Sequence, residues 1–240
     1  MKTLKIGLVV ADEHEFIPFE EYSKSFPYKS YFYMKNKYIE FSIVRGDKKI
    51  EVTSVLCGIG KVNAASAAAT LFNKGKADIM INFGLSGIIE GLHRGDILIS
   101  TTCVEHDFDI TPFGYKIGEK PQETSIYKAD ESLVSHFTGL FPHLQQGATV
   151  CGDQFISENN KKEFLRETFG AMSCDMESAA IASVCYQADI PFISIRKMSD
   201  LADESATDEY SDMNNSDDDA LVDIVMNGIL KLFDTYEFFL

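Results

Sequence analysis

Three carboxylate side chains stand just beyond runs of residues that are typical of buried β-strands. They are Glu15, Glu177 and Asp200, which lie far apart along the 240 residues of the chain. In open α/β proteins, ligands bind outside the carboxyl ends of the strands. Carboxyl groups at that edge are the usual acids and bases of small-molecule chemistry. The pattern therefore predicts an enzyme that performs acid/base chemistry on a small molecule.

Each of these carboxylates also has a plainer explanation. Asp200 fits the N-cap of a helix beginning near residue 202, and Glu177 precedes a predicted helix whose dipole favours a negative charge. Glu15 fits an acidic first helical turn. Arg196 is harder to explain in this way, because a charge inside a buried strand needs a partner.

Strands must alternate with helices to bring these residues together. Strands are predicted over residues 4–11, 38–44, 49–57, 79–83, 96–102, 148–151 and 192–196, with an edge strand or strand entry at 171–176. Helices are predicted over 15–23, 62–74, 131–137, 160–169, 178–187 and 217–238, the last capped by the polar run 214–219 through Ser216 and Asp219. The alternation favours a mainly parallel or mixed sheet with helices on both faces.

Residues 105–127 match neither pattern. The segment carries two prolines and two glycines among aromatic side chains. Loops of this length inside a compact domain are usually functional or form interfaces. We therefore expect this segment to contribute to a site or to a subunit contact.

Composition limits the class of protein. The chain is 45% hydrophobic, which is enough for one core, and we expect a single domain over residues 1–240. A formal charge of −15 repels nucleic-acid phosphates and anionic lipid, and no run of apolar residues approaches a membrane span. We expect a small neutral or cationic ligand and no nucleic-acid or membrane partner.

The five cysteines form no CxxC pair, and their odd number does not suit a disulfide framework or a zinc site. The apolar stretch near the N-terminus is shorter than the core of a signal peptide and runs directly into Asp12 and Glu13. Both features favour reduced thiols and a cytoplasmic location.

Two glycine-containing segments follow predicted strands, at residues 57–61 and 82–87. Glycine lets backbone amides approach a ligand closely, and a helix N-terminus favours anions. The first segment matches neither the P-loop nor the dinucleotide-binding pattern. Each segment is as consistent with a tight turn as with a binding loop, and in the second Ser86 and Gly87 would leave space for a flat ring.

Six stretches resemble, in order, the nucleoside phosphorylase/hydrolase superfamily and, within it, the 5′-methylthioadenosine/S-adenosylhomocysteine nucleosidases. The stretches are residues 6–15, 58–62, 106–115, 152–156, 175–182 and 196–200. The resemblance implies a three-layer α/β/α fold with a central twisted mixed sheet. It also implies a hydrolase of methionine salvage that uses no cofactor or metal and acts on a nucleoside.

The resemblance assigns the chemistry to the three carboxylates. Asp200 would protonate adenine N7, and Glu15 would activate the water that attacks the anomeric carbon. Glu177 would hold the ribose hydroxyls and stabilise the positive charge that develops on the sugar. Ser199 would orient Asp200.

Further binding residues follow from the same resemblance. Met176 would pack beneath the sugar, Phe155 would stack on the purine, and the backbone of Ile156 would read the purine edge. Arg196, Ser86 and Gly87 are also candidates for substrate binding, and Tyr210 is our choice for an aromatic ring that closes over the ligand.

The resemblance also implies a homodimer with shared sites. Ile59, Ile110 and Pro121 would line an apolar pocket for the 5′-alkylthio group. Phe113 and Tyr115 would reach into the site of the neighbouring subunit.

Two departures and two alternatives remain open. The family usually has Gly-Ser/Thr-Ala-Gly-Gly where this chain has Gly84, Leu85, Ser86, Gly87 and Ile88, and residues 205–216 also diverge. A phosphate-dependent nucleoside phosphorylase is disfavoured, because phosphate binding needs arginines. Acidic residues, which repel phosphate, follow the first strand, and no arginine precedes Arg45. A non-catalytic nucleoside-binding protein is the other alternative. The physiological nucleoside stays open among methylthioadenosine, adenosylhomocysteine, deoxyadenosine and futalosine types.

Overall fold

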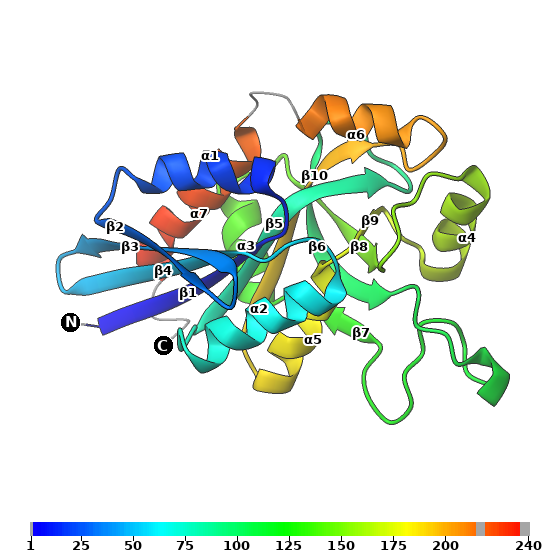
Figure 1. Cartoon of the computed structure of the whole chain (residues 1–240), viewed down its shortest axis with the longest axis horizontal. Coiled ribbons are helices and arrows are strands. Elements are labelled where there is room, and N and C mark those ends of the chain that lie inside the picture. The colour runs from blue at the N-terminus through cyan, green and yellow to red at the C-terminus, as the bar shows by residue number, and fades with distance from the viewer. Residues whose placement is uncertain (1, 215–218, 236–240) are drawn as a thin grey trace.

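A single ten-stranded mixed sheet runs through the protein (Figure 1). The computed structural model describes residues 2–214 and 219–235. The strands are β1 (Lys2–Val10), β2 (Tyr28–Tyr33), β3 (Asn36–Arg45), β4 (Lys48–Leu56), β5 (Ile79–Ile88), β6 (Ile97–Glu105), β7 (Ile126–Lys128), β8 (Gln145–Cys151), β9 (Ser173–Asp175) and β10 (Phe192–Asp200). The helices are α1 (Glu13–Ser23), α2 (Lys61–Asn73), α3 (Glu131–Leu140), α4 (Asn159–Phe169), α5 (Ser178–Ala188), α6 (Ala206–Asn214) and α7 (Ala220–Thr235), with a 3₁₀ turn at Thr111–Phe113.

Strand β5 is the centre of the sheet. It pairs in parallel with β1 and β10 and, at its carboxyl end, antiparallel with the short β9. Because β10 continues through β6 and β8 back to β9, these five strands close into a ring. Strands β4, β3 and β2 extend the sheet beyond β1 as an open wing (Figure 1).

Two apolar cores cover the two faces of the sheet. In β1, Leu4, Ile6 and Leu8 pack in the core formed with α1, α3 and α7, whereas Val9 faces the core formed with α2 and α5. This alternation follows from the two-residue period of a strand. The helices thus cover both faces, as the three-layer prediction requires.

Most predicted elements are present, and several boundaries differ. The predicted edge strand at 171–176 is wrong in its position, because β9 lies between β8 and β5 inside the sheet. Sequence reasoning missed β2, whose four central residues are exposed, as well as the short β7 and the polar α6. The predicted cap at Ser216 lies outside the described residues.

All five cysteines are buried free thiols. Among residues 2–214 and 219–235, no helix has the length and apolar content needed to span a bilayer.

Candidate active site

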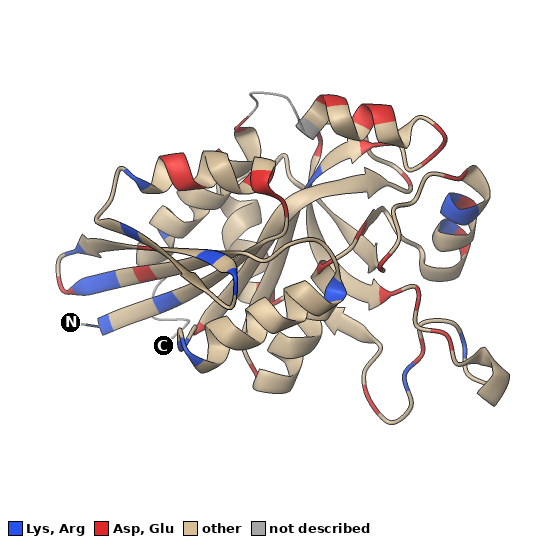
Figure 2. Cartoon of the chain, in the orientation of Figure 1, with Lys and Arg blue, Asp and Glu red and all other residues tan. Residues whose placement is uncertain are grey.

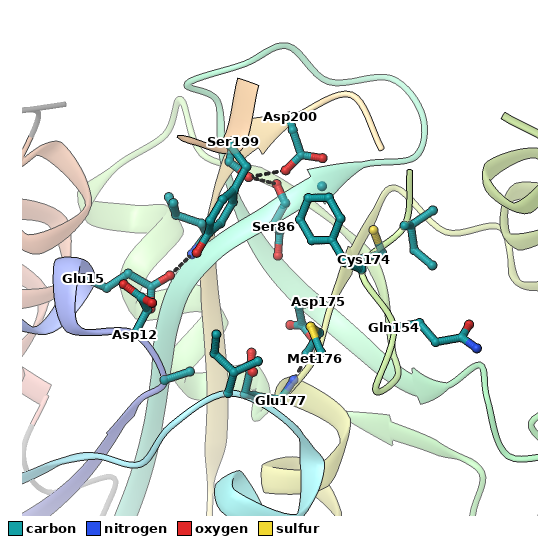
Figure 3. Close-up of a pocket in the computed structure, with 17 residues that line it drawn as sticks. Asp12, Glu15, Ser86, Gln154, Cys174, Asp175, Met176, Glu177, Ser199 and Asp200 are labelled. Atoms are coloured by element: carbon teal, nitrogen blue, oxygen red, sulfur yellow. Dashed lines mark hydrogen bonds between the residues drawn. The ribbon is translucent and has the colours of Figure 1, made fainter. Parts of the chain in front are cut away.

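A cavity of about 320 Å³ opens at the carboxyl ends of β1, β5 and β10 (Figure 3). The structure brings eleven of the predicted site residues to its lining. They are Glu15, Ile59, Ser86, Gly87, Phe155, Ile156, Met176, Glu177, Ser199, Asp200 and Tyr210.

Asp200 is the last residue of β10 and lies at one end of the cavity. Its Oδ2 accepts a 2.5 Å hydrogen bond from the Ser199 hydroxyl, and its Oδ1 accepts from the Ala202 amide at 3.0 Å. Burial raises the pKa of Asp200 above its ordinary value, although these hydrogen bonds oppose the shift. A carboxyl group in this environment can retain a proton and donate it to a ligand.

The capping role considered for Asp200 does not describe its position. The next helix, α6, begins only at Ala206, so the contact with Ala202 shapes the turn after the strand. Ser199 also donates to the Ser86 carbonyl oxygen at 3.1 Å, which ties β10 to β5 beneath the carboxyl group.

Glu15 projects from the first turn of α1 toward the edge of β5. Its Oε1 accepts a 2.7 Å hydrogen bond from the Leu85 amide, and its Oε2 is buried and has no hydrogen-bond partner among the residues that the structure describes. Burial raises the pKa of Glu15 to about 8, against the opposing effects of the Leu85 amide and Arg196. The free oxygen is available to a ligand or to a water molecule.

The topology of the sheet explains why Glu15 can reach this amide. Strand β1 pairs with β5 only as far as Asn82, and β9 begins to pair only at Gly87. The Met80 amide donates to the carbonyl oxygen of Pro191, just before β10, so the alternating amides at positions 81, 83 and 85 face the side of β1. Glu15 therefore satisfies an amide in the gap between two partner strands.

Glycine at position 84 is required by this arrangement. A Cβ there would lie 2.8 Å from Glu15 Oε2 and 2.6 Å from Arg196 Nη1. Both distances are shorter than any ordinary contact, so the glycine leaves the space that these charged groups occupy.

Glu177 immediately precedes α5, but its side chain does not cap the helix. Asp175 caps this helix instead, because its Oδ1 accepts from Ser178 N and Ser178 Oγ. The Glu177 carboxylate accepts a 2.9 Å hydrogen bond from the Gly60 amide and lies 3.5 Å from Arg196 Nη2. Burial raises the pKa of Glu177, which Arg196 opposes.

Arg196 lies behind the cavity and not in its lining. Its guanidinium is 1% exposed and forms a 2.6 Å ion pair with Asp175. The charge predicted to need a partner therefore has two, Asp175 and Glu177. Removing either partner from such a buried group costs several kcal/mol, about 3–5 in measured cases.

Aromatic and sulfur-containing side chains also line the cavity. Phe155 and Tyr210 meet edge to face with ring centroids 5.8 Å apart, and Met176 lies beside Glu177 (Figure 3). Phe155 is half-exposed, as is suitable for a ring that stacks on a ligand.

Four predicted residues of the 105–127 segment do not line this cavity. They are Ile110, Phe113, Tyr115 and Pro121. The segment projects away from the sheet (Figure 1), and Phe113 is 82% exposed.

Six further residues line the cavity that the sequence did not predict as ligand contacts. They are Ala11, Asp12, Leu85, Gln154, Cys174 and Asp175. Asp12 and Gln154 stand inside stretches that had already been singled out, so proximity to Glu15 and Phe155 was the available signal. Cys174 offered none, because a thiol in an apolar run is typical of a core.

The cavity is acidic. Five of its lining residues are carboxylates, and none of the described lining residues is lysine or arginine. Acidic side chains also mark α1 and α6 above it (Figure 2). Such surroundings disfavour an anionic co-substrate such as phosphate. Within the described part of the chain, no group of three or more His, Cys, Asp or Glu side chains is arranged to hold a metal ion.

Comparisons with known proteins identify the family. The model of the phosphorylase superfamily matches residues 5–231. A 5′-methylthioadenosine/S-adenosylhomocysteine nucleosidase from Staphylococcus carnosus is 41% identical over 162 residues, which is 65% of this chain and 71% of that protein.

Solved structures share the whole fold. The S-adenosylhomocysteine nucleosidase from Streptococcus pyogenes, in complex with 5-methylthiotubericidin, superposes with a TM-score of 0.86 at 28% identity and covers 96% of this chain and 98% of its own. The futalosine hydrolase of Helicobacter pylori reaches the same TM-score of 0.86 at 24% identity, covering 95% of this chain and 97% of its own, and shows the fold alone. The chain therefore belongs to the phosphorylase superfamily and, within it, to the 5′-methylthioadenosine/S-adenosylhomocysteine nucleosidases.

Proposed function

We propose that this protein hydrolyses the N-glycosidic bond of 5′-methylthioadenosine, S-adenosylhomocysteine or both, and releases adenine. The observation that carries the proposal is that Asp200, Glu15 and Glu177 line one cavity. Family membership supports the same reaction.

The reaction follows from the position of each group. Asp200 donates its proton to adenine N7, which turns the base into a neutral leaving group as the bond from N9 to the anomeric carbon breaks. Water forms the new bond to that carbon and gives its proton to Glu15. Both carboxyl groups then exchange protons with solvent, which restores the starting state.

The other cavity residues bind and orient the nucleoside. Glu177 accepts hydrogen bonds from the ribose hydroxyls and stabilises the oxocarbenium-like charge. Met176 packs beneath the sugar, Phe155 stacks on the purine and the Ile156 backbone reads its edge. Ser199 fixes Asp200, and Arg196 acts from behind by holding Glu177.

Ser86, Gly87 and Tyr210 complete the enclosure of the ligand. The Ser86 hydroxyl is buried and has no hydrogen-bond partner within the described residues, so it is available to the nucleoside. Tyr210 closes the cavity through its contact with Phe155.

We further propose a homodimer whose sites are shared. Ile59 lines the cavity of its own chain, whereas Ile110, Phe113, Tyr115 and Pro121 do not. In the dimer, these four residues would complete the 5′-alkylthio pocket of the partner subunit. The exposure of Phe113 supports this arrangement. As a single-domain cytoplasmic enzyme, the protein would serve methionine salvage.

The test is adenine release from a panel of nucleosides, with and without phosphate. The panel contains methylthioadenosine, adenosylhomocysteine, deoxyadenosine and a futalosine-type nucleoside, since a futalosine hydrolase shares the fold. We expect release from the first two, no stimulation by phosphate and free sugar as co-product. Ribose 1-phosphate as a product would show a phosphorylase, and binding without release would show a nucleoside-binding protein.

A further inference from the structure

A closed ring of hydrogen bonds lies behind the cavity wall and joins three distant segments. Lys61 Nζ donates to Asp107 Oδ1 at 2.6 Å, and Asp107 Oδ2 accepts from the Asp153 amide at 2.9 Å. Asp153 Oδ1 in turn accepts from the Lys61 amide at 2.8 Å. The ring therefore begins and ends at Lys61, the first residue of α2.

Charged groups make this ring strong. Lys61 Nζ also donates to Glu105 Oε2 at 2.9 Å, and Lys120 binds the other oxygen of Glu105. Although burial opposes charge on both, the mutual hydrogen bonds raise the pKa of Lys61 and lower that of Asp107. Both groups are then ionised at neutral pH, and charge-assisted hydrogen bonds are about twice as strong as neutral ones.

The ring reaches the cavity at two places. Gly60 immediately precedes Lys61, and its amide donates the 2.9 Å hydrogen bond to Glu177. Phe155 follows Asp153 by two residues and forms part of the cavity wall. A shift of the ring would therefore move a donor to Glu177 and the aromatic wall together.

The backbone at Gly60 leaves little freedom for such a shift. Its φ of +100° is a conformation that other residues rarely adopt. A Cβ there would also approach Asp153 Oδ1 to 3.0 Å. Two successive amides are thus fixed, that of Gly60 by Glu177 and that of Lys61 by Asp153.

We propose that Lys61 and Asp107 are positioning residues for the reaction. Through Asp153 they fix the Gly60 amide on Glu177 and place Phe155 against the purine. The inference rests on the proposed nucleosidase function for the identity of the ligand. Neither residue touches the cavity, so their effect on catalysis is indirect. A misplacement of reacting groups by about 1 Å costs up to about 100-fold in rate.

The central variant is Lys61→Met, which keeps the length of the side chain and the backbone amide but removes both Nζ hydrogen bonds. The matched control is Lys49→Met, which removes a lysine–glutamate ion pair with Glu51 at the opposite end of β4, the strand that leads to Gly60. We expect Lys61→Met to lower kcat/KM by about 10- to 100-fold. The kcat/KM of the control should stay within about twofold of the wild-type value, while its melting temperature falls slightly because an ion pair is lost.

A double-mutant cycle separates positioning from general destabilisation. If Lys61 acts through Asp153, Lys61→Met should cost less than about threefold in an Asp153→Ala background, because residues in one network are not additive. Effects that simply multiply, or a folded Lys61→Met with the wild-type kcat/KM, would overturn the proposal. Asp107→Asn replaces Lys61→Met in the same cycle if the latter does not fold.

Adenine affinity, measured by calorimetry, tests the positioning role independently of the proposed nucleosidase activity. If the wild type releases no adenine from any nucleoside, the proposed function fails. The positioning role is then decided by whether Lys61→Met weakens adenine binding severalfold while Lys49→Met does not. Equal affinities in the two variants would overturn it.

Discussion

At the scale of single residues, burial acts in the same direction on the two carboxyl groups that we propose as acid and base, although their tasks are opposite. Burial raises the pKa of Asp200 and of Glu15. For an acid this is useful, because a raised pKa favours the protonated form that can donate to the purine. For a base it is a cost, because Glu15 must lose its proton before it can accept one from water.

The first prediction concerns the acid. We expect Asp200→Asn to keep the fold and to lower kcat by about 10²- to 10⁴-fold, because an amide cannot deliver a proton to N7. Steady-state kinetics and the melting temperature check this together. A variant that retains more than half of the wild-type rate would remove Asp200 from the mechanism.

The second prediction concerns the base and pH. Because the pKa of Glu15 in the free enzyme is about 8, kcat/KM should rise with pH until this carboxyl group is ionised. The effect of Glu15 on the stability of the fold has the opposite dependence on pH. The folded protein holds a proton that the unfolded chain releases above its ordinary value of 4.5, so stability falls as pH rises from about 4.5 to about 8.

Glu15→Gln checks both effects. The kcat/KM profile of the variant should lack the rising limb. Its melting temperature should fall less than that of the wild type between pH 5 and about 8. It should still bind adenine, because its assigned role is to activate water. A rising limb that persists in the variant would assign the limb to another group.

At the scale of elements, β5 supports most of the site. It leaves β1 after Asn82, offers the Leu85 amide to Glu15, and meets β9 at Gly87. A gap between partner strands is normally a weakness of a sheet, since an unpaired buried amide costs about 1–3 kcal/mol. Here the Glu15 carboxylate accepts the hydrogen bond of the otherwise unpaired amide.

The third prediction follows from the space at this gap. We expect Gly84→Ala to destabilise the fold by about 1–3 kcal/mol and to impair catalysis, because its Cβ would displace Glu15 or Arg196. Gly139→Ala is the control, since a Cβ there meets nothing within 4 Å and alanine favours the helix α3. Equal catalytic rates in the two variants would contradict the tight fit at Gly84.

Much of this arrangement could be predicted from the sequence. Long apolar runs such as those of β1 and β10 determine the strands, and residues just beyond them reach the ligand edge by topology alone. That rule located Glu15 and Asp200. It also extended to Glu177, which stands two residues after the end of β9.

The rest depends on contacts that no local pattern encodes. The three residues of β9 are too few to show alternation, so their place inside the sheet follows only from pairing with β8 and β5. Cys174 and Asp175 line the cavity for the same reason. The ion pairs of Arg196 with Asp175 and Glu177 likewise depend on neighbours that are distant in the sequence.

At the scale of the whole molecule, the 105–127 segment and the open wing of the sheet lie at opposite ends (Figure 1). Both expose aromatic side chains, with Phe113 82% and Phe32 75% accessible. Lysines and arginines gather on the wing, whereas acidic residues dominate α6 near the cavity (Figure 2). A partner subunit that completes the site must meet the end with Phe113.

The fourth prediction tests this contact. Replacing Phe113 and Tyr115 by serine should weaken self-association and raise KM together, because the same residues would bury in the dimer and line the partner's pocket. Sedimentation and steady-state kinetics measure the two effects. Phe32→Ser is the control, because Phe32 is a similarly exposed aromatic residue on the wing. It should change neither self-association nor KM. A catalytically competent wild-type monomer would show that one chain holds the complete site.

The hydrogen bond between Leu85 and Glu15 also makes the backbone a sensor of the base. A bond from an amide to a carboxylate is shorter and stronger than one to a neutral carboxyl group. The nitrogen and proton resonances of Leu85 should therefore move as Glu15 ionises, with a midpoint near the pKa of about 8. A ¹⁵N-labelled sample would then report the charge state of the proposed base directly, in the free protein and with adenine bound, without any turnover.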